Sequence, residues 1–160
     1  MILVTVGTHS QGFDRLVQPM DELAAQLAEK VIIQRGSSRY EPQYAEHFQW
    51  TTNQCMEELT QQARLVVIHA GAGSIILALR YSKPLVVVPR LQCFNEHIDD
   101  HQLQLAKAME DEGRAIVVHN PSIVELKNAI EKAQKREQQI SSCCQQLVSA
   151  LQQQLKQWES

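Results

Sequence analysis

The chain has 160 residues, a formal net charge of −3 and 5% aromatic residues, so it offers neither the basic surface nor the stacking platforms that hold nucleic acid. No apolar run approaches the roughly 20 residues that cross a bilayer, and the apolar start lacks the basic flank and cleavage site of a signal peptide. No Cys-x-x-Cys pair occurs among Cys55, Cys93, Cys143 and Cys144, which favours free thiols in a reducing cytosol.

The first predicted element is an apolar, β-branched strand over residues 2–6. An amphipathic helix is expected over residues 13–30, because apolar residues recur there at intervals of three and four. Pro19 lies near enough to the start of this helix to be tolerated. Two short strands are expected next, at residues 31–33 and 47–50, with a polar loop between them.

The second half of the chain alternates helices with buried strands. In chain order these are a helix at 56–63, a strand at 65–69, a helix at 74–81, a strand at 84–89, a helix at 99–113, a strand at 115–118 and a helix at 120–134. We expect Asn120 to cap the last helix, with Pro121 at its first helical position, where a missing N–H is tolerated.

This order of elements predicts an α/β fold, a Rossmann-like doubly wound parallel sheet of about six strands covered by helices on both faces. Ligands in such sheets bind beyond the carboxyl ends of the strands. That rule points to the loops at residues 7–13, 69–74 and 90–102. We expect one domain over residues 1–134, followed by a long C-terminal helix over residues 135–160.

The C-terminal helix carries a narrow apolar stripe on an otherwise polar, glutamine-rich segment. Its residues are Ile140, Cys144, Leu147, Leu151, Leu155 and Trp158. Such a stripe packs either on its own domain or on a partner chain, and the sequence leaves both alternatives open.

The segment "HAGAGS" at residues 69–74 lies where a strand gives way to a helix. Gly71 and Gly73 would let the backbone approach a ligand, and Ser74 would open the helix, where free N–H groups and the helix dipole favour an anion. His69 ends the strand and can donate to a phosphate oxygen. The pattern lacks the lysine of a Walker loop and the third glycine of a dinucleotide fingerprint, so a diphosphate cradle and a plain tight turn are both open.

Three motifs in order resemble a known family: "VTVGTHSQGFDRLV", "HAGAGSIILALRYSKPLVVVPR" and "NEHIDDHQLQLA". Over roughly residues 1–130 they look like the donor-binding half of the MurG-like glycosyltransferases of GT-B fold. The half-sized members are the most similar, namely the catalytic subunit of the dolichol-linked UDP-N-acetylglucosamine transferase and the PssE-type exopolysaccharide subunits.

The resemblance implies roles for particular residues. In a UDP-sugar donor, the diphosphate would be held by His69, Gly71, Gly73 and Ser74. The hydroxyls of the donor sugar would be bound by His101 and Gln102, with Asp100 beside them.

The resemblance also places the uracil in the turn at residues 50–56, which includes Thr52 and Asn53. One position departs from the pattern, because many relatives carry a glutamate for the ribose hydroxyls where this chain has Leu77. PssE-type chains resemble this one in lacking that glutamate, which favours the bacterial polysaccharide branch.

Other candidate residues have competing interpretations. His97 and His101 have the spacing of zinc ligands on a helix, although this spacing occurs often by chance. His9 is either a general base or a solvated loop histidine, and Asp14 is more simply a charge at a helix N-terminus. Arg90 either supports the diphosphate or is an ordinary surface arginine.

The resemblance implies a metal-independent, inverting glycosyltransferase subunit that needs no cofactor. It would move a sugar from a UDP-sugar to a lipid-linked acceptor, together with a membrane-anchored partner that binds the acceptor. The base would come from that partner or from His9, and the chain would be cytoplasmic, at the inner face of the membrane. The alternative is a non-catalytic subunit that enhances a partner transferase, which the missing ribose glutamate motivates.

Overall fold

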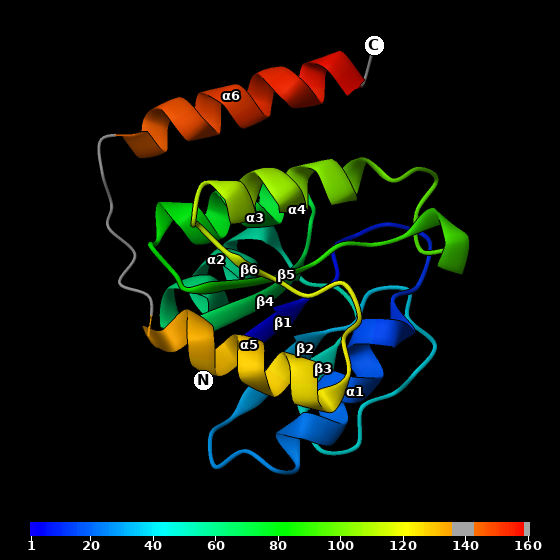
Figure 1. Cartoon of the computed structure of the whole chain (residues 1–160). Helices are drawn as coiled ribbons and strands as arrows, with labels where there is room; N and C mark the ends of the chain where they lie inside the picture. The colour runs from blue at the N-terminus through cyan, green and yellow to red at the C-terminus, as the bar shows by residue number, and fades with distance from the viewer. Residues whose placement is uncertain (136–142, 159–160) are drawn as a thin grey trace.

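The computed structural model describes residues 1–135 and 143–158. Its centre is a six-stranded sheet in the order β3-β2-β1-β4-β5-β6, in which every neighbouring pair is parallel (Figure 1). The strands are β1 (Ile2–Thr5), β2 (Val31–Gln34), β3 (Glu46–Phe48), β4 (Leu65–His69), β5 (Leu85–Val88) and β6 (Ile116–Val117). The predicted fold class is confirmed.

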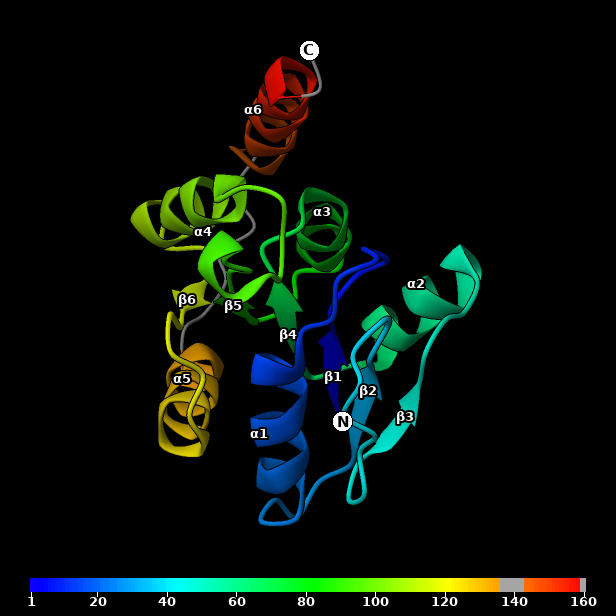
Figure 2. The same cartoon turned by 90° about the vertical axis from the view of Figure 1, so that its right-hand side faces the viewer.

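Helices cover both faces of this sheet (Figure 2). They are α1 (Asp14–Ala24), α2 (Asn53–Gln62), α3 (Ala72–Arg80), α4 (His101–Asp111), α5 (Ile123–Lys135) and α6 (Cys143–Trp158), with a 3-10 turn η1 (Gln92–Phe94). Alternate strand residues enter different cores: Ile2 and Val4 of β1 pack with α1 and α5, whereas Leu3 packs with α3 and α4. Two buried faces explain why the inner strands β1, β2, β4 and β5 are largely apolar.

Four of the helices α1 to α5 begin two or more residues from the predicted start, among them α4, which begins at His101 rather than at residue 99. Helix α2 begins at Asn53, because the hydroxyl of Thr52 accepts a hydrogen bond from the backbone N–H of Cys55 and caps it. Helix α3 begins at Ala72 rather than at residue 74. The prediction of Asn120 as the cap of α5 is wrong, since Ser122 accepts from the N–H of Glu125 and fills that role.

The C-terminal helix α6 packs against α3. Leu151 of its apolar stripe is buried in the core cluster on that face of the sheet, so this residue packs on the chain's own domain. Ile140 lies outside the described residues, and the side chains of Cys144, Leu147, Leu155 and Trp158 do as well. Within the described parts of the chain, no helix combines the length and apolar character needed to cross a membrane.

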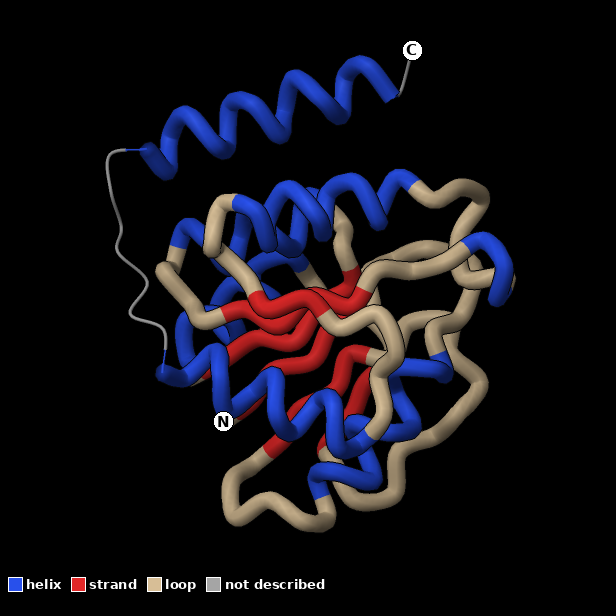
Figure 3. Tube along the Cα trace, in the orientation of Figure 1, coloured by secondary structure: helices blue, strands red, loops and turns tan. Residues whose placement is uncertain are grey.

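The loops after β1 and β5 gather on one side of the molecule, at the carboxyl ends of the strands (Figure 3). This is the edge at which a doubly wound sheet binds ligands, and it carries the three loops that the sequence points to.

Candidate functional site

A first cavity, of about 690 Å³, lies at this carboxyl edge. It is lined by Thr5, Gly7, Thr8, Gln34, Trp50, Thr51, Asn53, Met56, His69, Gly71, Gly73, Ser74 and Leu77. The predicted diphosphate residues, His69 and the start of α3, therefore face the same space as Asn53 of the predicted uracil turn. Thr52, Asp100, His101 and Gln102 do not line this cavity.

The N-terminus of α3 presents unused backbone donors. Gly71 is the N-cap residue, without a side-chain cap, and its carbonyl accepts the first helical hydrogen bond from the N–H of Ile75 (3.1 Å). The N–H groups of Ala72, Gly73 and Ser74 precede that bond, so they have no partner within the helix. Together with the helix dipole they favour an anion here, as the diphosphate interpretation requires.

His69 ends β4 with only 8% of its surface exposed. Its Nδ1 lies 3.3 Å from the carbonyl oxygen of Thr5 and must donate to it, because a carbonyl only accepts. Burial, and secondarily the charge of Arg90, lowers the pKa of His69 to about 3. The imidazole is therefore neutral, with an unprotonated Nε2. The expectation that His69 donates to a phosphate does not fit this tautomer, and the α3 donors are left to meet the diphosphate.

The three glycines near His69 differ in the space that a side chain would find at each position. A Cβ on Gly71 would overlap Nε2 of His69 and lie 2.7 Å from its Cδ2. A Cβ on Gly7, which has a φ of +79°, would lie 2.6 Å from the same Nε2. A Cβ on Gly73 would meet nothing within 4 Å. Gly7 and Gly71 thus make room for the imidazole, and Gly73 leaves space open where a ligand would reach the helix.

Two further residues line the first cavity. Trp50, the first residue of the predicted uracil turn, is half exposed and offers an aromatic face there. The other residue, Gln34, was missed by sequence reasoning. Gln34 is buried at the end of β2, where its Oε1 accepts from the hydroxyl of Thr5 (2.7 Å) and the N–H of Gly7 (3.1 Å). Its Nε2 donates to the carbonyls of Gly7 and Gln49 (3.0 Å each), which ties the loop after β1 to the exit of β3.

Arg90, two residues after the end of β5, is completely buried. Its guanidinium donates to the backbone carbonyls of Val6 (2.6 Å), Gln11 (2.8 Å), Gly12 (3.2 Å) and Glu96 (2.8 Å). Both interpretations of this residue are therefore wrong, since it is not on the surface and its donors face loop carbonyls rather than a diphosphate. Arg90 joins the loop after β1 to the loop after β5.

The predicted sugar-binding residues brace the loop after β5. The buried Gln102 accepts from the backbone N–H of Arg90 through Oε1 (3.0 Å). Asp100 accepts from the backbone N–H of Gln92 (2.9 Å). The Nδ1 of His101 lies 3.2 Å from a carboxylate oxygen of Asp99. Whether these side chains also reach a sugar stays a prediction.

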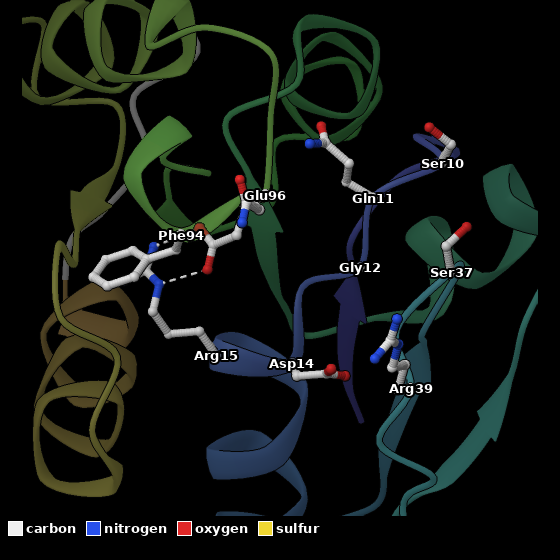
Figure 4. Close-up of a pocket in the computed structure, with 10 residues that line it drawn as sticks. Ser10, Gln11, Gly12, Asp14, Arg15, Ser37, Arg39, Phe94 and Glu96 are labelled. Carbon is white, nitrogen blue, oxygen red and sulfur yellow. Dashed lines mark hydrogen bonds and ion pairs between the residues drawn. The ribbon is translucent and has the colours of Figure 1, made fainter.

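A second cavity, of about 640 Å³, lies between the loops after β1, β2 and β5 (Figure 4). Arg15 donates to the carboxylate of Glu96 from Nε (2.7 Å) and Nη2 (3.0 Å), and Phe94 lies beside this pair. Asp14, in the first turn of α1, also lines the cavity and accepts from the N–H of Tyr40 (2.9 Å). The remaining lining residues are Ser10, Gln11, Gly12, Ser37, Arg39 and Asn95.

The candidate histidines His9 and His97 lie in the loops after β1 and β5, and their rings are close together. The ring centroids of His9 and His97 are 4.8 Å apart, and the Nδ1 of His97 lies 3.1 Å from Asp99. His97 and His101 thus share one carboxylate. Among the residues that the structure describes, no group of three or more histidine, cysteine, aspartate or glutamate side chains is arranged to hold a metal ion.

Solved glycosyltransferases share this fold at low sequence identity. The glycotransferase of kitacinnamycin superposes with a TM-score of 0.63 at 19% identity, over 96% of this chain and 38% of that chain. MurG from Acinetobacter baumannii gives a TM-score of 0.55 at 19% identity, over 94% of this chain and 49% of that chain. The molecule therefore has the fold of one part of a GT-B glycosyltransferase.

The chain belongs to the glycosyltransferase family 28 C-terminal domain family, whose sequence pattern matches residues 1–157. It is similar to the human UDP-N-acetylglucosamine transferase subunit ALG13, with 36% identity over 123 residues, or 70% of this chain. The matched segment is 10% of the human protein, so the chain spans only a small part of that relative's length. The family resemblance stated from the motifs is confirmed.

A bacterial relative shows a shorter match. The UDP-N-acetylglucosamine--N-acetylmuramyl-(pentapeptide) pyrophosphoryl-undecaprenol N-acetylglucosamine transferase of Opitutus terrae is 39% identical over 64 residues. These residues are 40% of this chain and 16% of that protein.

Proposed function

We propose that this chain is the donor-binding catalytic subunit of a two-component inverting glycosyltransferase. It would take a sugar from a UDP-sugar and, with a membrane-anchored partner, transfer it to a lipid-linked acceptor. The observation that carries this proposal is the first cavity, where the free donors of α3 face the turn that contains Trp50 and Asn53. A nucleoside diphosphate needs an anion site and an aromatic or polar nucleobase site within one cleft.

The proposed chemistry follows from the start of α3. As the bond between the sugar and the diphosphate breaks, negative charge grows on the leaving UDP. The N–H groups of Ala72, Gly73 and Ser74 and the positive end of the helix dipole would stabilise that charge in place. In this proposal the helix N-terminus does the work that a divalent cation does in metal-dependent transferases.

The proposed donor and pathway rest on the relatives. The human and Opitutus proteins are both named as UDP-N-acetylglucosamine transferases, so this nucleotide sugar is the first donor to test. Leu77 stands where the resemblance places a ribose glutamate, and PssE-type chains resemble this one in that respect. We therefore favour polysaccharide biosynthesis, with the chain at the cytoplasmic face of the membrane through its partner.

The need for a partner is proposed because the human relative is named as a subunit of a transferase. This chain corresponds to 38% to 49% of the solved glycosyltransferases that it resembles. Both cavities lie at the same carboxyl edge of the sheet, which is where the partner subunit would have to approach. Orienting an acceptor against the donor supplies a large part of such a reaction's rate, and that orientation would come from the partner subunit.

A second function is favoured by Leu77 alone. Without a carboxylate for the ribose, the chain would be a non-catalytic subunit that enhances a partner transferase. Binding of UDP discriminates between the two functions, because the enhancer has no need of a nucleotide site.

The test is a calorimetric titration of UDP into the purified chain, followed by a transfer assay. Ser74→Ala should weaken UDP binding about tenfold, since a charge-assisted hydrogen bond is worth roughly 1–3 kcal/mol. Ser149→Ala, on the exposed side of α6, is the matched control and should bind UDP normally. Transfer from UDP-N-acetylglucosamine to a membrane lipid extract should require the co-expressed partner. A chain that binds no UDP, alone or with its partner, would be the enhancer.

A further inference from the structure

The loops after β1 and β5 bring two histidines together beside a carboxylate. His9 belongs to the first loop, and its ring centroid lies 4.8 Å from that of His97 in the second loop. Asp99 accepts from the Nδ1 of His97 (3.1 Å) and from the backbone N–H of His101 (3.0 Å). These two imidazoles accept no hydrogen bond from Arg90 and do not belong to the proposed diphosphate site.

The cluster adjoins residues that line both cavities. His9 follows Thr8, which lines the first cavity, and precedes Ser10, which lines the second. His97 follows Glu96, which also lines the second cavity (Figure 4). An acceptor in the second cavity and a sugar that extends from the diphosphate in the first would both approach the loops that carry these histidines.

The hydrogen bonds fix the tautomer of His97. A carboxylate only accepts, so the Nδ1 of His97 carries a proton and donates a hydrogen bond to Asp99. The backbone N–H of Asp99 also approaches this nitrogen, but at 3.4 Å it is the weaker, longer interaction. In the neutral ring, Nε2 is then unprotonated, and no hydrogen bond from the described part of the chain reaches it.

His9 has the opposite arrangement. Its Nδ1 accepts from the backbone N–H of Gln11 (3.2 Å), so the proton of the neutral ring is on Nε2. Burial, followed by the charges of His97 and Arg90, lowers the pKa of His9 and favours this neutral form. His9 can donate a hydrogen bond from Nε2 but cannot take a proton there. This argues against His9 as the base.

We propose that His97 is the general base of the transfer and that Asp99 is the residue that positions it. This inference rests on the proposed transferase function. The acceptor O–H bond breaks and its proton passes to Nε2 of His97, while the oxygen forms a bond to the anomeric carbon. The bond from that carbon to the diphosphate oxygen breaks, and its electron pair leaves on UDP. An imidazole whose Nδ1–H is held by a carboxylate is suited to this role, because both its tautomer and its orientation are fixed.

The test compares variants of the complex of this chain with its co-expressed partner, with radiolabelled UDP-N-acetylglucosamine as donor and a membrane lipid extract as acceptor. His97→Gln should lower kcat at least 100-fold, since general bases contribute about 10²–10⁴-fold, and should leave the donor KM within threefold. His9→Gln should lower kcat far less. His119→Gln is the matched control, because His119 is exposed and contacts Arg15 only through its backbone carbonyl.

A second measurement does not depend on activity. Long-range ¹H–¹⁵N spectra of the isolated chain should show the Nδ1–H tautomer for His97 and the Nε2–H tautomer for His9. Asp99→Asn should abolish the preference at His97 and reduce kcat with little change in donor KM.

The outcomes distinguish a failure of the proposed transferase function from a failure of His97 as the base. A wild-type complex without transfer activity contradicts the proposed function. An active complex in which His97→Gln keeps kcat within threefold overturns the assignment of the base, and so does an Nε2–H tautomer at His97. If His97→Gln does not fold, the tautomer and the kcat of Asp99→Asn decide the matter in the same way.

Discussion

The imidazole of His69 occupies the space where Gly71 lacks a Cβ, so the turn after β4 is wrapped around the side chain that ends the strand. Gly71→Ala would force the ring out of its hydrogen bond to Thr5 and into its neighbours. We expect a loss of roughly 1–3 kcal/mol in the free energy of unfolding, the range for overpacked cores. Urea unfolding of the variant measures it. Unchanged stability would show that the ring can move without cost.

Gly73, two residues further on, should respond in the opposite way. A Cβ there meets only open space, and alanine is favoured over glycine in a helix, so Gly73→Ala should fold at least as stably as the parent chain. The same methyl group would stand where the diphosphate is proposed to approach α3. We expect UDP affinity to fall tenfold or more in a calorimetric titration. Normal binding would place the anion elsewhere.

The neutral state of His69 predicts a pH dependence of stability. Its pKa is about 3 in the folded chain, against an ordinary value of 6.5, so the unfolded chain binds more protons between these values. The contribution of His69 to the free energy of unfolding should therefore be fully present above pH 6.5. It should fall as the pH drops toward 3, by on the order of 1 kcal/mol per pH unit.

A comparison with His69→Asn isolates this effect. The difference in stability between the parent chain and the variant should shrink steadily from pH 6.5 to 4.5. Burial alone would raise the pKa of Asp21, but hydrogen bonds from three backbone N–H groups and Tyr40 outweigh it and lower the pKa. The stability that Asp21 contributes is therefore lost only at more acidic pH, outside that range. A constant difference across the range would mean that His69 is charged in the folded chain or titrates normally.

The four inner strands β1, β2, β4 and β5 were predictable because each is buried along its whole length and so appears as a largely apolar run, such as "LVVI" at residues 65–68. The edge strand β3 is only partly buried and carries the polar residues Glu46 and His47, so its signal in the sequence is weaker. The turn before α3, where we propose that an anion binds, was predictable because a glycine-rich turn between strand and helix is a local pattern. Both signals lie within a few residues of the feature that they predict.

The environments of Arg90 and His69 were not predictable in this way. The carbonyls that receive the guanidinium of Arg90 belong partly to Val6 and Gln11, more than 70 positions away. The tautomer of His69 is set by Thr5, 64 positions away. A charged residue after a strand is usually exposed, so only the assembled fold shows that this one is an internal brace.

Gln102 should have two separable roles. Its Oε1 satisfies the backbone N–H of Arg90, so Gln102→Met would leave a buried donor unpaired and lower the free energy of unfolding by about 1–3 kcal/mol. UDP lacks the sugar, so UDP affinity should change little while transfer of the sugar is largely lost. Gln104→Met, exposed on the same helix, is the matched control. Equal losses of UDP affinity and transfer would make Gln102 part of the nucleotide pocket or of the fold alone.

Leu77 offers a gain of function as the last test. Its side chain is half-buried and lines the first cavity one turn beyond the start of α3, where the resemblance places a ribose-binding glutamate. Leu77→Glu should raise the affinity for UDP about tenfold, because a carboxylate can accept charge-assisted hydrogen bonds from both ribose hydroxyls at roughly 1–3 kcal/mol in total. Leu77→Gln accepts without a charge and should give a smaller gain. Uridine should share the gain and uracil should not, since only the former carries the ribose. A glutamate variant that folds but binds UDP no better than the parent chain would show that the ribose lies away from α3, and the nucleotide would then have to be placed in the cavity differently.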